Sequence, residues 1–111
     1  MMTAAAYPTK SKEERIHHLR EARTMAIRGG LRTQNIALQR ACTAASHALS
    51  QIIGRVLVMA SEDEVRAALN GLPNVLSVKQ LALAMRTYPA DMKAAGLEGI
   101  DWHLAFAESD T

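Results

Sequence analysis

The sequence has few aromatic residues and a single cysteine. Aromatic residues make up 4% of the 111 positions, whereas alanine, leucine and methionine, which favour helices, are plentiful. Because strands are enriched in aromatic and β-branched side chains, this bias points away from β-sheets. One cysteine also excludes a framework of internal disulfides. The composition therefore predicts an all-α protein held together by packing.

No stretch of the chain has the length of a membrane span. A spanning helix needs about 20 consecutive apolar residues, and no run in this sequence approaches that length. The first 15 residues also lack the apolar segment of a signal peptide. We therefore expect a cytoplasmic protein with no membrane partner.

The balance of apolar and charged residues is that of a folded domain. Hydrophobic residues make up 49% and charged residues 22%, which is typical of globular proteins and unlike disordered chains. The chain is also long enough for one domain with its own core. Residues 1–10 show no periodicity. We expect a flexible N-terminal arm over residues 1–10 and a single helical domain over residues 11–111.

Capping patterns, glycines and prolines divide this domain into four to six helices. Ser11 with Glu14, and later Ser61, begin capping boxes that mark helix starts. The pair Gly29-Gly30 is expected to end the first helix, because glycine adopts the left-handed conformation found at helix ends. Residues 100–107 alternate like a strand, although their alanines favour a helix. The expected helices cover about 12–28, 33–60, 61–70, 77–88, 90–95 and 100–107.

The longest regular apolar pattern lies in the second of these helices. Seven side chains, which we call the seam, recur at spacings of 4, 3, 4, 3, 4 and 3: Leu38, Cys42, Ala45, Leu49, Ile52, Val56 and Met59. This spacing places them on one side of a helix and is also the pattern of a coiled coil. The seam therefore lines either the protein's own core or the surface where a second chain binds.

The length of this helix favours a second chain. A continuous helix over residues 33–60 would be about 42 Å long, whereas a compact domain of this size is about 35 Å across. The helix must project and pair with another copy, break near Gly54, or change into a short strand at residues 55–59. We predict a helical bundle organised by this long helix and a homodimer formed through the seam.

The two halves of the chain carry opposite charge. Residues 1–60 contain nine basic and three acidic residues, a net charge of +6, whereas residues 61–111 have a net charge of −4 from four basic and eight acidic residues. A basic half attracts phosphates or an acidic protein surface. The candidate binding residues are Lys10, Lys12, Arg15, Arg20, Arg23, Arg28 and Arg32.

Three of these cations, Lys12, Arg15 and Arg23, fall within or beside the apolar side of the first helix. Their stems can cover the core while their charged ends reach water or the acidic residues of the second half. The alternative is that they bind a partner directly. The sequence leaves both interpretations open.

No catalytic or metal-binding motif is recognisable. His17 and His18 each follow a glutamate by four residues, but adjacent histidines point about 100° apart on a helix and cannot chelate one ion together. Cys42 lies in the seam, where a thiol behaves as a small apolar group. We expect no enzymatic activity, no cofactor, no metal ion and no small-molecule substrate.

Charge and pattern together predict a small accessory or regulatory protein. Its basic N-terminal half would bind nucleic acid or a nucleoprotein. The alternative is an adaptor or inhibitor, such as a phage- or plasmid-encoded protein that blocks a host protein. In that case the basic and apolar side of the first helix would dock on the other protein.

Overall fold

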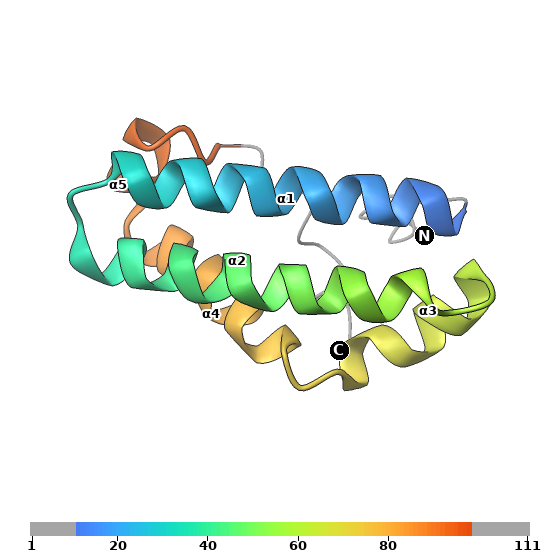
Figure 1. The fold of residues 1–111 in the computed structure, drawn as a ribbon. Coiled ribbons are helices and arrows are strands. Elements are labelled where there is room, and N and C mark those ends of the chain that lie inside the picture. Colours follow the sequence, from blue (N-terminus) through green and yellow to red (C-terminus); the bar gives the residue numbers. More distant parts are fainter. Residues whose placement is uncertain (1–10, 99–111) are drawn as a thin grey trace, which may run out of the picture.

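Five α-helices make up the part of the chain that the computed structural model describes, residues 11–98 (Figure 1). They are α1 (Lys12–Arg32), α2 (Ile36–Leu57), α3 (Glu62–Ala68), α4 (Val75–Thr87) and α5 (Pro89–Ala94), with a 3-10 turn, η2 (Leu69–Gly71), between α3 and α4. Residues 11–98 contain no strand, which confirms the predicted all-α fold. The expected arm, Lys10 and the expected helix at 100–107 lie outside these residues.

The two long helices, α1 and α2, form an antiparallel hairpin that dominates the molecule (Figure 1). Ser11 caps α1 by accepting a hydrogen bond from the Glu14 amide at 3.1 Å. Asn35 caps α2 in the same way, with its side-chain oxygen 3.1 Å from the Leu38 amide nitrogen. Short polar side chains at these positions satisfy amides that have no partner within the helix, so they fix where each helix begins.

The first helix does not end at the glycine pair, as its sequence suggested, but continues to Arg32. Both glycines are buried, because neighbouring elements approach α1 closely there. A Cβ atom at Gly29 would lie 2.5 Å from a methyl carbon of Leu97, and one at Gly30 would lie 3.2 Å from the Cβ of Cys42. These glycines therefore serve close packing inside a helix and not its termination.

The seam lies in the core of this single chain, which corrects the expectation that it forms a surface for self-association. Leu38, Cys42, Ala45, Leu49, Ile52 and Val56 have no exposed surface, and Met59, just beyond the helix, is partly buried. α1 and α4 both pack against α2 and cover these residues. The argument for a dimer that was drawn from the seam therefore no longer applies, although a dimer through another surface stays a prediction.

The second helix is shorter than expected and the molecule is elongated, so the helix fits within one chain. α2 passes through Gly54 without a break and ends at Leu57, so it has 22 residues and is about 33 Å long. The molecule measures 40 × 30 × 20 Å. A helix of this length lies along the long axis of such a body without projecting from it. Residues 55–57 continue the helix and form no strand.

The remaining helices cover the second side of α2. α4 buries Val75, Val78, Leu81, Ala82 and Met85. α5 is tied to the start of α2 by a hydrogen bond of 2.8 Å from the Asn35 side chain to the Asp91 carboxylate. After α5 the chain turns at Gly96, which has a positive φ of 76°, and inserts Leu97 against Gly29. Among residues 11–98, no helix combines the length and apolar character that crossing a membrane requires.

Candidate binding groove between α1 and α2

Lys12, the first of the predicted binding cations, stabilises the end of α2. Its ammonium group lies 2.9 Å from the Met59 carbonyl oxygen and 3.4 Å from that of Leu57. Carbonyls at the end of a helix lack amide partners and carry partial negative charge, so a lysine there is favourable. Lys12 therefore has a structural role within the hairpin.

Arg15 has turned inward and pairs with an acidic residue of the second half. It is 4% exposed, and its Nη2 lies 2.5 Å from Oε2 of Glu62, while its Nε lies 3.5 Å from Oε1. Arg66 also approaches the same carboxylate, at 3.5 Å. Of the two interpretations of this cation, the contact with an acid of the C-terminal half is confirmed. Arg15 fastens α1 to the start of α3.

Arg32 lies over the turn that follows α5. A Cβ atom at Gly96 would be 2.7 Å from Nη1 of Arg32, so the guanidinium occupies the space that a side chain there would need. Arg32 is exposed, but its position serves the contact between the end of α1 and this turn. Three predicted binding residues thus contact other parts of the same chain.

Arg20, Arg23 and Arg28 remain on the surface of α1. Arg20 and Arg28 are exposed, and Arg23 is half-buried with its Nη1 3.4 Å from the hydroxyl of Ser50 on α2. The structure therefore separates the predicted cations into two groups. Arg20 and Arg28 extend from the outer side of α1, and Arg23 lies between α1 and α2 with part of its surface accessible.

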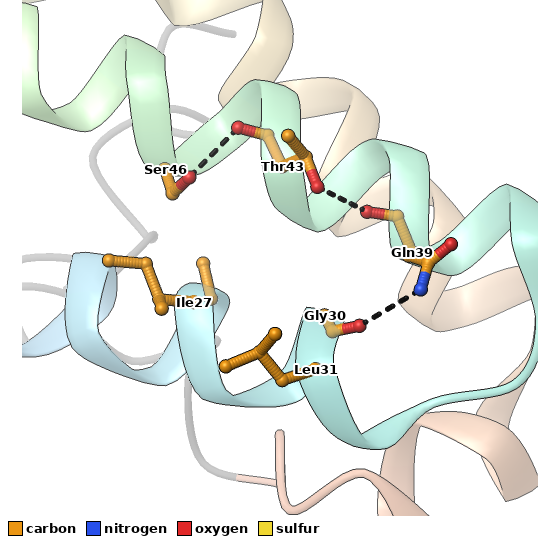
Figure 2. Close-up of a pocket in the computed structure, with 7 residues that line it drawn as sticks. Ile27, Gly30, Leu31, Gln39, Thr43 and Ser46 are labelled. Carbon is orange, nitrogen blue, oxygen red and sulfur yellow. Dashed lines mark hydrogen bonds between the residues drawn. The ribbon is translucent and has the colours of Figure 1, made fainter.

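A shallow groove of about 270 Å³ runs between α1 and α2 close to the turn of the hairpin (Figure 2). Its lining consists of Ala26, Ile27, Gly30 and Leu31 from α1 and Gln39, Thr43 and Ser46 from α2. Ile27 is 47% and Leu31 82% exposed, although both are large and apolar. The α1 wall of the groove is thus apolar, and the α2 wall is polar.

The hydroxyl groups on the α2 wall use their donors within the protein. The Thr43 hydroxyl donates to the Gln39 carbonyl at 3.1 Å, and the Ser46 hydroxyl donates to the Thr43 carbonyl at 2.8 Å. The Gln39 side-chain amide donates to the Gly30 carbonyl at 3.4 Å, as Figure 2 shows. A hydroxyl has one donor and two acceptor sites. The Gln39 amide has a second N–H, so this wall offers hydroxyl acceptors and an amide donor to a bound molecule.

Arginines lie at one end of the groove. Arg20 and Arg23 precede Ile27 by seven and four residues, so they share its side of α1. Arg23 meets Ser50 one turn beyond Ser46, which extends the polar wall of α2 towards the cations. α2 contains no acidic residue from Ile36 to Leu57. The groove thus combines an apolar wall, a polar wall and a positively charged end.

Cys42 lies beneath this region and has the properties of a buried apolar residue. It is fully buried, and burial raises the pKa of its thiol from 9.0 to about 11. Because the thiolate is the reactive form, we expect almost no modification of the native protein by Ellman's reagent at neutral pH. Complete modification is expected once the chain is unfolded in guanidinium chloride. Rapid reaction of the native protein would contradict the burial of this residue.

The other chemistry-bearing side chains are not gathered into a site. Residues 11–98 contain no group of three or more His, Cys, Asp or Glu side chains placed to hold a metal ion. His17 is exposed on α1, and its ring lies 5.6 Å from that of His18. Among residues 11–98, the groove between α1 and α2 therefore remains as a candidate site.

The groove was not found from the sequence because its two walls come from different helices. Ile27 lies on α1 and Thr43 on α2, and the spacing within either helix does not show that they line one groove. The absence of acidic residues along α2 was the available signal, since it leaves Glu13, Glu14 and Glu21 of α1 as the acidic residues of the hairpin and gives the hairpin a positive net charge. No protein-family model, curated protein or solved structure matches the chain.

Proposed function

We propose that this protein is a non-enzymatic adaptor or inhibitor that binds an acidic, partly apolar segment of another protein in the groove between α1 and α2. The observation that carries this proposal is the exposure of Ile27 and Leu31 beside Arg20 and Arg23. Burying one large aliphatic side chain contributes about 1.5–3 kcal/mol. Arginine and large apolar residues together are typical of the centres of protein interfaces.

The polar groups of the α2 wall suit a protein segment. Phosphate oxygens are acceptors only, so they need donors on the surface that binds them. The hydroxyls of Thr43 and Ser46 use their donors on backbone carbonyls and keep their acceptor sites. A protein segment supplies backbone and side-chain N–H groups that suit these acceptors.

Nucleic-acid binding is the second candidate, and the composition of α2 supports it. This helix has no acidic residue, and its solvent side exposes Arg40, His47 and Arg55. Together with Arg20 and Arg28 these residues give the hairpin a positive surface on which phosphates could lie. A binding mode of this kind depends on charge and weakens steeply as salt is added.

The experiment compares three versions of the full chain in affinity capture from the source cell: the wild type, Leu31→Asp and Leu83→Asp. Leu83 is 58% exposed on α4 and serves as a matched control. We expect a discrete set of proteins that the wild type and Leu83→Asp retain and Leu31→Asp loses. A set retained equally by both variants would refute the groove as the docking site.

Random duplex DNA, labelled for fluorescence anisotropy, distinguishes the second candidate. If the proposal is right, DNA binding at low salt is weak and Leu31→Asp leaves it unchanged, since DNA does not need the apolar wall. If several phosphates are neutralised, the affinity falls steeply with salt and is lowered by Arg20→Glu. That result, without discrete protein partners, would favour nucleic acid over protein.

A further inference from the structure

The groove between α1 and α2 has the chemistry to bind a segment of this same chain. We propose that residues 99–111, the C-terminal segment, occupy the groove when no partner is bound and compete with the partner for it. This inference rests on the proposed function, because it assumes that the groove accepts an acidic and apolar segment. It adds a regulation of that site.

The composition of the C-terminal segment complements the groove. The segment carries four large apolar residues, Ile100, Trp102, Leu104 and Phe106, and three acidic residues, Asp101, Glu108 and Asp110, with no lysine or arginine. Its apolar side chains suit the exposed Ile27 and Leu31, and its net charge of −3 suits the arginines at the end of the groove.

The position of Trp102 in the segment makes it a reporter of docking. It lies four residues after Glu98, up to about 13 Å along an extended chain, so a docked segment places it where the chain crosses α1 towards the groove. A tryptophan covered by the surface of a helix buries a large apolar area and is shielded from water.

The segment begins within reach of the groove. Leu97 is fully buried against Gly29, so the described chain ends, at Glu98, beside the last turns of α1. The 13 residues that follow span up to about 43 Å when extended. A chain that passes around a helix about 10–12 Å in diameter, from one side to the other, needs about half of this extended length. Leu104 and Phe106, up to about 20 and 26 Å from Glu98 along an extended chain, can therefore reach Ile27 and Leu31.

A second copy of the chain suits the groove less well. A second copy whose groove faced this one would bring its own Arg20, Arg23 and Arg28, so the two surfaces that meet would carry charge of the same sign. Like charges brought together in this way are destabilising. The C-terminal segment brings opposite charge, and its covalent connection raises its effective concentration at the groove to the millimolar range.

Trp102 makes the test direct, because it is the only tryptophan of the chain. The full-length protein is excited at the tryptophan band, and its emission maximum and quenching by neutral acrylamide are recorded without any partner. We expect a shielded Trp102 in the wild type. Leu31→Asp and Arg23→Glu should each shift the emission to longer wavelength and raise the quenching constant severalfold, while Leu83→Asp changes neither. Circular dichroism verifies that the variants keep their helices.

Three outcomes would overturn the inference. Trp102 could be exposed in the wild type, it could be shielded but insensitive to Leu31→Asp and Arg23→Glu, or its shielding could disappear on dilution, which would make the occupant the segment of a second copy. The fluorescence needs no partner, whereas the capture experiment reads partner binding alone. If Leu31→Asp loses partners without affecting Trp102, the proposed function stands and this inference fails.

Discussion

Replacing Leu49 by alanine should lower the free energy of unfolding by about 3–5 kcal/mol. Leu49 is fully buried in the middle of α2, where α1 and α4 both pack against that helix. The truncated side chain leaves a cavity that the surrounding helices can fill only in part, so the lost packing adds to the lost burial. Equilibrium unfolding in urea, followed by circular dichroism, measures the change.

The matched control is Leu83→Ala, the same truncation at an exposed position of α4. It should change the free energy of unfolding by about 0.5 kcal/mol or less. If the seam lines the core of one chain, the unfolding midpoints of the wild type and of Leu49→Ala are independent of protein concentration. Midpoints that fall on dilution would show that association contributes to stability. A Leu49→Ala variant as stable as Leu83→Ala would contradict the packing around α2.

The seam shows what its spacing could and could not reveal. Spacings of three and four residues correctly located a helix and the side chains that it buries. They are the same for the central helix of a monomeric bundle and for a coiled coil, because both need one apolar side. The preference for a second chain came from comparing the helix with a sphere. The molecule is elongated, 40 × 30 × 20 Å, so α2 has room along its long axis.

The starts of α1 and α3 were predictable because the interactions that set them are local. Ser11 and Ser61 each accept a hydrogen bond from the amide three residues later, as the capping pattern indicated. The end of α1 was not predictable in this way. Gly29 and Gly30 have the sequence signature of a helix stop, but their role depends on Leu97 and Cys42, which lie far along the chain.

The contacts of Lys12 and Arg15 were also not predictable, because their partners lie far along the chain. Lys12 contacts carbonyls 45 and 47 positions later, and Arg15 contacts a carboxylate 47 positions later. The net charge of a segment does not show where each charged side chain lies in the fold. It therefore could not distinguish Lys12 and Arg15 from Arg20, Arg23 and Arg28. The uneven charge of the halves is partly explained by such contacts, since α1 from one half meets α3 from the other.

Replacing Arg15 by methionine should lower the free energy of unfolding by about 3 kcal/mol. Methionine keeps most of the aliphatic stem, so the main loss is the charge that faces Glu62, whose side chain is 10% exposed. Breaking a buried ion pair on one side typically costs 3–5 kcal/mol, because the remaining charge is left in a poorly solvated place. Arg66, at 3.5 Å from the same carboxylate, compensates in part. We therefore expect a loss of stability at the lower end of that range. Equilibrium unfolding in urea measures it.

The control is Arg20→Met on the exposed side of the same helix, which should change stability by about 0.5 kcal/mol or less. The double variant Arg15→Met with Glu62→Gln removes both charges and should recover a large part of the loss, because no buried carboxylate is then unpaired. Arg15→Met should also leave Trp102 fluorescence and partner capture unchanged, whereas Arg23→Glu alters both. If Arg15→Met were as stable as Arg20→Met and lost the partners, Arg15 would belong to the binding surface and not to the contact between α1 and α3.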